Sequence, residues 1–233
     1  MSFSIVIPVF NEKKNIPLLI SKILYTLKKR KYEIIIVDDS STDGSKEVLL
    51  KLRKKIKHLR VIFRNKKIRD LSKSCTDGFE KSKYKEILVM DGDLQHNPKY
   101  IPIMIKKMEK FNCECVVGSR NLISSRVKSL SLFRQSASFI LIKFFNIFFG
   151  KKTIDPMSGF FLFKKKIYKK NKKKLFLKGF KILADLIYVE KKISVKDVII
   201  KFDYRKKGES KLNFKILIIL LQFILFRLIK NIS

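Results

Sequence analysis

The sequence predicts an α/β fold with a mainly parallel central sheet. Over the first 120 residues, short apolar runs alternate with segments in which apolar residues recur at helical spacing. Strict alternation of strand and helix is typical of a parallel sheet that is covered by helices on both faces. The chain has 233 residues, of which 46% are hydrophobic, so one domain with a sizeable core and a small appendage is expected.

The strands are expected where apolar runs lack polar alternation, as in strands buried on both faces. A helix is expected from Ile16 to Leu27, where apolar residues recur at helical spacing. Another helix is expected after Asn97, because Asn is a common N-cap and Pro98 fits the first helical position. Cys113 and Cys115 are two apart in the last run and are predicted to point to one face of the sheet. The expected strands are 3–9, 33–37, 59–63, 86–90 and 113–117, and the remaining helices run from the turn 38–44 to about 57 and over 71–81.

Short polar clusters follow four of these strands. They are the pairs Asn11-Glu12, Asp38-Asp39 and Ser119-Arg120 and the triplet Asp91-Gly92-Asp93. Sheets of this class bind ligands at the carboxyl ends of their strands, so the four clusters are expected to converge on one cleft. Two carboxylates two residues apart can share a divalent cation such as Mg²⁺ or Mn²⁺ and, through it, the diphosphate of a nucleotide. Asp and Gly are also ordinary turn residues, so the triplet alone does not distinguish a metal site from a simple turn.

The net charge of +34 indicates either a highly solvated surface or an anionic partner. The lysines are spread over the whole chain, and the densest run, 164–174, has no base-reading motif, which argues against nucleic acid. A solvated surface and an anionic membrane surface both stay open, and the membrane surface is the partner expected if the charge has one. The three cysteines have no zinc or redox spacing, so reduced structural cysteines are expected. The N-terminus lacks a basic region before its short apolar run, so a cytoplasmic catalytic part is expected.

Two apolar segments in the second half, 139–149 and 216–229, are flanked by lysines. Spanning a bilayer takes about 20 apolar residues, which neither segment reaches, so both are expected to lie in the membrane interface rather than to cross it. A buried core helix or an oligomer contact is the alternative. The expected organisation is a catalytic domain at 1–212, which includes an interfacial helix region at about 129–150, and a membrane-associating hydrophobic helix at 213–233.

The strand-end motifs in this order resemble those of family 2 glycosyltransferases of the GT-A fold, and within them the dolichol- and polyprenol-phosphate sugar synthases. Further segments of the second half resemble the same family, so the resemblance covers about 3–212. These segments are 118–120, 133–138, 155–160, 179–183 and 203–211.

The resemblance implies roles for individual residues. The nucleotide base and ribose would be lined by Pro8, Phe10, Glu12, Val37 and Asp39. The metal and the donor diphosphate would be held by Asp91, Asp93 and Gln95, with Gly92 allowing close approach. Donor and acceptor phosphates would be neutralised by Arg120, Arg134, Arg205 and Lys211, with Ser210 beside the acceptor phosphate. Within this set the catalytic residues would be Asp93, Arg120, Arg205 and Lys211.

The chain departs from the family pattern at three positions. Phe10 stands where many members have Tyr, which would remove a hydroxyl contact. Asp70 stands where many have Gly in a loop that flanks the donor, which puts the donor's identity in doubt. Asp185 replaces Glu of some members. His96 is expected to stabilise its turn rather than to act in catalysis, and Asp155 either contacts the acceptor or caps a turn.

The implied reaction is inverting transfer of a hexose from GDP-mannose or UDP-glucose to a polyprenyl phosphate. The protein would then lie at the cytoplasmic face of the membrane, as a peripheral or monotopic protein. The sequence leaves open whether a separate transmembrane protein is a partner. The nearest alternative is a family 2 enzyme that glycosylates a hydroxyl of a glycan or a lipid-linked saccharide. A polyanion-binding or nucleic-acid-binding protein is a distant alternative, because it leaves the four strand-end clusters unexplained.

Overall fold

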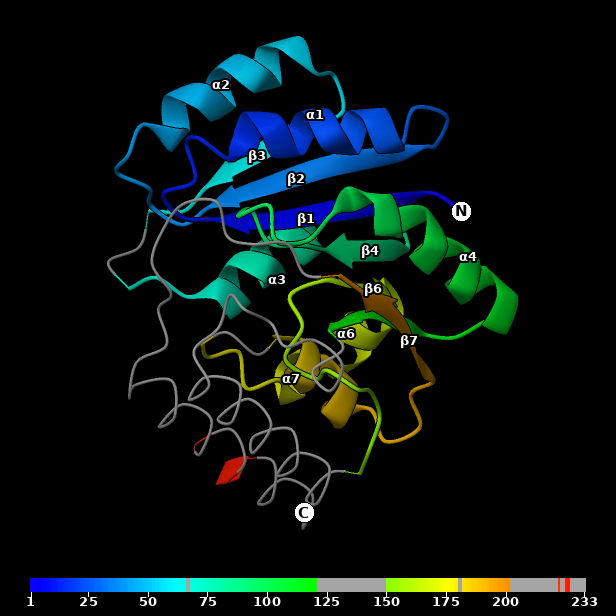
Figure 1. Cartoon of the computed structure of the whole chain (residues 1–233). Coiled ribbons are helices and arrows are strands. Elements are labelled where there is room, and N and C mark those ends of the chain that lie inside the picture. Colours follow the sequence, from blue (N-terminus) through cyan, green and yellow to red (C-terminus); the bar gives the residue numbers. More distant parts are fainter. Residues whose placement is uncertain (66–67, 121–149, 180–181, 202–221, 223–224, 227–233) are drawn as a thin grey trace.

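The computed structural model describes residues 1–65, 68–120, 150–179 and 182–201, together with 222, 225 and 226. Its strands form one seven-stranded sheet in the order β3-β2-β1-β4-β6-β5-β7 (Figure 1). The strands are β1 (Phe3–Val9), β2 (Tyr32–Asp38), β3 (Leu59–Phe63), β4 (Glu86–Val89), β5 (Cys115–Arg120), β6 (Phe161–Lys164) and β7 (Val195–Ile200). The helices are α1 (Ile16–Thr26), α2 (Ser45–Lys55), α3 (Leu71–Lys81), α4 (Ile101–Phe111), α6 (Lys165–Asn171) and α7 (Ile182–Val189), with 3₁₀ turns η1 (Pro98–Tyr100) and η2 (Lys172–Lys174).

The sheet is mainly parallel, as predicted. The pairs β1–β2, β1–β4, β2–β3 and β5–β7 are parallel, and β6 is antiparallel to its neighbours β4 and β5. Because β6 lies between β4 and β5, the segment that enters β6 passes between the carboxyl ends of these two strands.

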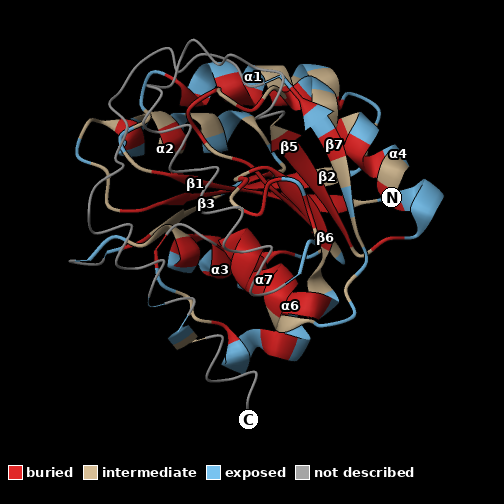
Figure 2. Cartoon of the chain, turned by 60° about the horizontal axis from the view of Figure 1, so that its bottom comes forward, coloured by how far each residue is buried: buried red, intermediate tan, exposed pale blue. Residues whose placement is uncertain are grey.

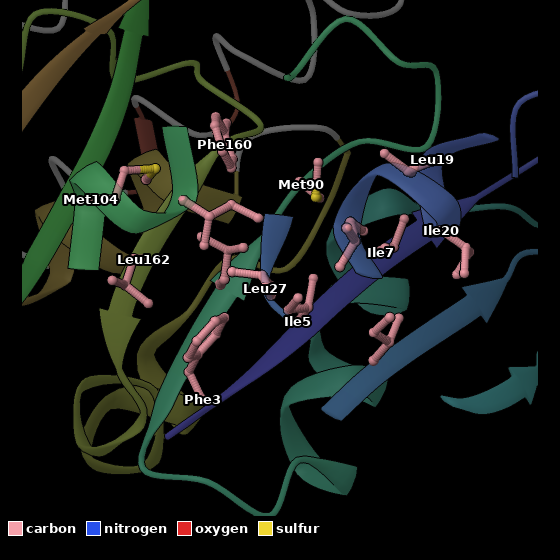
Figure 3. Packing of buried hydrophobic residues seen from close by; sticks show 14 of the residues in the cluster. Phe3, Ile5, Ile7, Leu19, Ile20, Leu27, Met90, Met104, Phe160 and Leu162 are labelled. Atoms are coloured by element: carbon pink, nitrogen blue, oxygen red, sulfur yellow. The ribbon is translucent and has the colours of Figure 1, made fainter. Parts of the chain in front are cut away.

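Helices cover both faces of the sheet, which explains why its central strands are largely apolar. Every residue of β1 is buried, and Figure 2 shows the central strands in the colour of buried residues between helices with exposed outer faces. One core cluster joins α1 and α4 to the sheet through residues such as Phe3, Leu19 and Met104 (Figure 3). The other joins α3 and α7 to the opposite face through residues such as Phe79 and Leu183.

Two local expectations have different outcomes. Asn97 caps η1 by accepting a hydrogen bond from Lys99 N at 3.1 Å, with Pro98 at the first position, as predicted. The prediction that Cys113 and Cys115 share a face is wrong, because they belong to the two different core clusters. Strand β5 begins only at Cys115, after a left-handed Asn112, so the two-residue repeat of a strand does not apply to Cys113.

The hydrophobic segments predicted for the membrane lie almost wholly outside the described residues. Of the region at 129–150 only Gly150 is described, and of 213–233 only Gln222, Leu225 and Phe226. In the described part of the chain, no helix has both the length and the apolar character needed to cross a bilayer.

Candidate active site

The predicted acidic triplet and Arg120 meet at the carboxyl edge of the sheet, on either side of the loop that enters β6. Asp91 lies two residues after the end of β4, and Arg120 is the last residue of β5. Asp155 and Gly159 belong to the intervening loop and contact Arg120 and Asp91 respectively. The loop therefore joins the two predicted phosphate-binding elements into one site.

Arg120 is held by a two-point contact with Asp155. Its Nε donates to Asp155 Oδ2 at 2.6 Å and its Nη2 to Asp155 Oδ1 at 3.0 Å. The Asp155 side chain is 0% exposed. Burial lowers the pKa of Arg120, but the charge and hydrogen bonds of Asp155 outweigh this and raise the pKa. Arg120 is thus a permanent cation whose guanidinium plane is fixed, which is the geometry that suits phosphate recognition.

Asp155 is fixed from a second side by Asp197, which lies within β7. Thr153 and Ser119 both donate hydroxyl hydrogen bonds to Asp197, and the amide of Ile154 lies 3.3 Å from the same carboxylate. These contacts secure the chain immediately before Asp155. The position of Arg120 therefore depends on strand β7, which lies far from it in the sequence.

The Asp91 carboxylate lies against a glycine. A Cβ atom added at Gly159 would stand 2.3 Å from Asp91 Oδ2 and 2.7 Å from Oδ1, where no side chain fits. The Asp91 side chain is 36% exposed, so it reaches the surface of the site. Gly159 therefore sets the position of Asp91 by leaving room for it.

His96 supports the Asp91 turn from the interior. The Asp91 amide lies 3.3 Å from His96 Nδ1 and donates to it, which requires Nδ1 to be unprotonated. Burial, followed by the charge of Arg120, lowers the pKa of His96 to about 3. The ring also stacks on Phe160, with centroids 5.2 Å apart. A neutral buried imidazole in this position stabilises the turn, which agrees with the role expected for His96.

The segment from Asp93 to Gln95 forms a tight turn. Asp93 is buried, and its Oδ1 accepts a hydrogen bond from Gln95 N at 3.1 Å. Leu94 between them has φ of 66°, a left-handed conformation that costs free energy in a residue with a side chain. Such local strain concentrates at functional sites.

The donor set suits a hard divalent cation that is shared with a ligand. Asp91, Asp93 and Gln95 offer only oxygen ligands of the kind that Mg²⁺ and Mn²⁺ prefer, with Asp91 open to the exterior. Over the described residues, no group of three or more His, Cys, Asp or Glu side chains is placed to hold a metal by itself. Two carboxylates completed by substrate phosphates are the usual arrangement for Mg²⁺, so the residues fit that mode of binding.

Phe10, one of the residues predicted to line the nucleotide, lies next to a cation. The guanidinium carbon of Arg69 stands 4.0 Å from the centroid of the Phe10 ring, a cation–π contact. Phe10 is partly buried and Arg69 is exposed. The pair presents two flat groups of the kind on which a nucleobase stacks.

Asp39 is engaged by the protein itself. Its Oδ1 forms a buried ion pair with Arg64 Nη1, and its Oδ2 accepts a hydrogen bond from Asp70 N at 2.9 Å. Arg64 also bonds Asp77 through Nε at 2.9 Å and Ser74 Oγ at 2.9 Å. Asp39 therefore fixes the loop between β3 and α3, and its predicted nucleotide contact stays a prediction.

Asp70, the departure from the family pattern, connects two loops. It caps α3 by accepting from Lys73 N at 3.1 Å, and its Oδ2 accepts from Gly179 N at 3.0 Å. Ser72 returns a hydrogen bond to Gly179 O. A glycine could make neither side-chain contact, so Asp70 adds a fixed link between the start of α3 and the segment before α7.

Other predicted residues are placed less decisively. Glu12 accepts from Asn15 Nδ2 at 2.6 Å, and Pro8 and Val37 are buried within their strands, with Val37 in the core cluster beneath α3. Arg134, Arg205, Ser210 and Lys211 lie outside the described residues.

Replacing Gly159 by alanine is expected to lower turnover by at least about tenfold with little loss of stability. The added methyl group would displace the Asp91 carboxylate, which is partly exposed and can move at low cost to folding. Thermal unfolding and steady-state kinetics of the variant measure the two effects separately. Gly78→Ala is the matched control: its methyl would meet the buried Val6 Cγ1 at 2.4 Å, so it should reduce stability more than turnover. Normal turnover of Gly159→Ala would contradict the role given to this glycine.

Arg64, Arg69 and Gly159 were not among the residues predicted from the sequence. An arginine directly after strand β3 is the one signal that could have drawn attention to Arg64. The contacts of Arg69 with Phe10 and of Gly159 with Asp91 join segments far apart in the chain, and no local pattern reveals them.

The chain matches the family model described as Glycosyl transferase family 2 over residues 4–171. It is 34% identical to a dolichol-phosphate mannosyltransferase of Pyrococcus furiosus over 99% of this chain and 64% of that protein, so it spans slightly less than two thirds of that relative. A dolichol-phosphate mannosyltransferase of Saccharomyces cerevisiae is 30% identical over 95% of this chain and 85% of its own length.

Solved structures show the same fold. Glucosyl-3-phosphoglycerate synthase of Mycobacterium tuberculosis, crystallised with Mn²⁺, UDP and glucosyl-3-phosphoglycerate, superimposes with a TM-score of 0.65 at 16% identity, covering 98% of this chain and 79% of that chain. S. aureus TarS in complex with UDP-GlcNAc gives 0.63 at 15% identity, covering 97% and 66%. These likenesses confirm the predicted GT-A fold. Because the family model matches most of the chain and relatives at 30–34% identity extend along nearly all of it, this chain belongs to glycosyl transferase family 2.

Proposed function

We propose that the protein transfers a hexose from a nucleotide-sugar to a polyprenyl phosphate, with inversion at the anomeric carbon. The observation that carries this proposal is the site itself, in which a pair of strand-end carboxylates stands beside a guanidinium fixed by a buried carboxylate. Such a site suits a reaction between two phosphate-bearing substrates. The two named relatives are dolichol-phosphate mannosyltransferases, which supports a lipid phosphate acceptor and favours mannose over glucose as the transferred sugar.

Asp91, Asp93 and Gln95 are the residues that would hold a divalent cation against the donor diphosphate. Mg²⁺ or Mn²⁺ bound there would supply a Lewis acid that stabilises the negative charge of the leaving nucleoside diphosphate. The bound Mn²⁺ and UDP of the mycobacterial structure support this use of the fold.

Arg120 would neutralise phosphate charge between the donor and the acceptor. A phosphate oxygen forms the new bond to the anomeric carbon, and the bond from that carbon to the donor diphosphate breaks, with its electron pair leaving on the diphosphate. Two anions must approach each other for this step, so a fixed cation between them lowers the barrier. Arg134, Arg205, Ser210 and Lys211 are proposed to complete this cationic surface.

A phosphate acceptor also agrees with the state of His96, the histidine beside the acidic triplet. A phosphate is ionised at neutral pH, whereas a hydroxyl acceptor needs a group that takes its proton. His96 is buried, and its Nδ1 already accepts the Asp91 amide, so it does not serve as that base. This supports a phosphate acceptor over the hydroxyl of a glycan or lipid-linked saccharide.

Phe10→Ala is expected to raise the dissociation constant for the donor nucleotide by roughly tenfold, because loss of a stacking surface costs about 1–2 kcal/mol. Titration calorimetry with the free nucleoside diphosphate measures this. Phe10→Tyr should bind at least as well as the native protein, since the ring is kept and a hydroxyl is added. Tyr25→Ala, on an exposed ring of α1, is the control and should leave affinity unchanged. An unchanged affinity in Phe10→Ala would remove Phe10 from the nucleotide site.

The donor is tested by incubating the protein with labelled GDP-mannose and labelled UDP-glucose in parallel, with polyprenyl phosphate in detergent and Mg²⁺ or Mn²⁺. Label is expected in the lipid phase with one donor, and EDTA should abolish it. A folded protein that binds neither nucleotide would contradict the proposal. We further propose that the enzyme works at the cytoplasmic face of the membrane as a peripheral or monotopic protein, where its acceptor would lie.

A further inference from the structure

The helix α6 and the turn η2 carry the highest density of cations in the described chain, on the surface of the layer that contains α3 and α7 (Figure 1). Ile167, Tyr168 and Asn171 form the buried side of this segment. The lysines occupy the opposite side. The exposed ones, here called the basic face, are Lys166, Lys169, Lys170, Lys172, Lys173, Lys174 and Lys178.

Acidic residues neutralise only part of the basic face. Lys166 pairs with Glu114, Lys170 with Glu190 and Lys172 with Glu80. Within the described part of the chain, no ion pair involves the other four, Lys169, Lys173, Lys174 and Lys178. The basic face therefore keeps a positive excess concentrated on a short segment, unlike lysines scattered over a solvated surface.

The basic face continues into apolar groups. Phe176, which follows η2, packs against Phe226 of the C-terminal segment, with ring centroids 5.2 Å apart. Leu225 beside it is 59% exposed. Cations next to exposed apolar side chains form the pattern with which peripheral proteins bind lipid headgroups and the outer acyl region.

The loop that joins these groups has a fixed conformation. Buried Asp185 accepts the amides of Phe176 and Leu177 through Oδ2, at 2.7 and 3.0 Å. Leu177 is held in a left-handed conformation with φ of 51°. The same loop ends at Gly179, which is bonded to Asp70 and Ser72 at the start of α3. The basic face is thereby connected rigidly to the loop that flanks the predicted donor.

From these observations we infer that the basic face is the surface with which this protein docks on a bilayer of anionic phospholipid. The inference extends the proposed function, since docking here would hold the site at the membrane that contains a lipid acceptor. Charge complementarity selects anionic headgroups, and the adjoining Leu225 and Phe226 select a bilayer over a soluble polyanion. Docking itself needs neither donor nor acceptor.

The test is sedimentation of the full chain with vesicles of phosphatidylcholine alone and with 30% phosphatidylglycerol. The variant carries Lys169, Lys173 and Lys174 replaced by Gln. The control carries Lys51, Lys54 and Lys55 replaced by Gln, which removes the same charge from exposed positions of α2, on the other side of the sheet. At low salt the first variant should bind the anionic vesicles at least about tenfold more weakly than the native protein, and the control within about threefold. Sugar transfer in detergent should stay unchanged in both.

Equal losses in the two variants would show that only net charge matters and would overturn the inference. So would native binding that is equally strong to neutral vesicles. Binding of a short RNA is measured in the same way. If the RNA binds through the same three lysines while anionic vesicles do not bind, the basic face binds a soluble polyanion instead. Because vesicle binding is measured without substrates, its failure leaves the proposed reaction standing, and a failed reaction leaves the docking result standing.

Discussion

Asp91→Asn is expected to reduce sugar transfer by at least about 10²-fold to 10³-fold while leaving the fold intact. The substitution keeps the shape of the side chain and the backbone contact with His96, but it removes a negative charge that would bind a cation beside the donor diphosphate. Loss of one preorganised electrostatic contact to a transition state has an effect of about this size. The measurement is kcat/KM for transfer to polyprenyl phosphate, together with a thermal unfolding curve.

The control for Asp91→Asn is Glu109→Gln. Glu109 is a half-exposed carboxylate on α4 that pairs with the N-terminal amine at 3.3 Å, so its loss also removes one negative charge. It should leave transfer within about twofold of the native rate. If Asp91→Asn were as active as this control, the acidic triplet would have no part in binding the donor.

Asp155→Asn is expected to reduce both stability and transfer. It breaks the two-point contact by removing the charge of the fully buried carboxylate that holds Arg120. Removing one member of a buried ion pair costs about 3–5 kcal/mol. For a chain of this size about 1 kcal/mol corresponds to roughly 2–4 °C, so we expect the melting temperature to fall by about 6–20 °C.

The effect of Asp155→Asn on transfer should be about tenfold to 100-fold, because a mobile guanidinium no longer positions phosphate. Kinetics at a temperature well below the lowered melting point separate this from unfolding, and kcat should fall more than KM rises if the acceptor still binds. Lys166→Gln breaks the exposed pair with Glu114 and should change neither quantity measurably. A loss of stability with normal kcat would leave Asp155 a purely structural residue.

The strands of the first half could be predicted because they are buried on both faces and therefore read as uninterrupted apolar runs. Strand β4 ends one residue earlier than expected, and β5 starts two residues later, after the turn at Asn112. Strands β6 and β7 were not predicted. The first has only four residues, and the second mixes exposed and buried positions, so neither has a pattern that separates it from a loop or a short helix.

The acidic triplet and Arg120 could be predicted because strand-end position and residue type are both local properties of the sequence. How these groups are held could not, since it depends on contacts between distant segments. The sequence left two roles for Asp155, an acceptor contact or a turn cap. Its bonds to Arg120 link a loop before β6 to the end of β5, which no local pattern shows. The room that Gly159 leaves for Asp91 is likewise a property of the folded chain.

A phosphate acceptor is tested by offering two lipids, a polyprenyl phosphate and the corresponding polyprenol, with the donor that supports transfer. We expect label only in the phosphate lipid, with the sugar released from it by mild acid, and loss of that product in Asp91→Asn. Transfer to the polyprenol, or to a lipid-linked saccharide hydroxyl while the phosphate stays unlabelled, would contradict a phosphate acceptor.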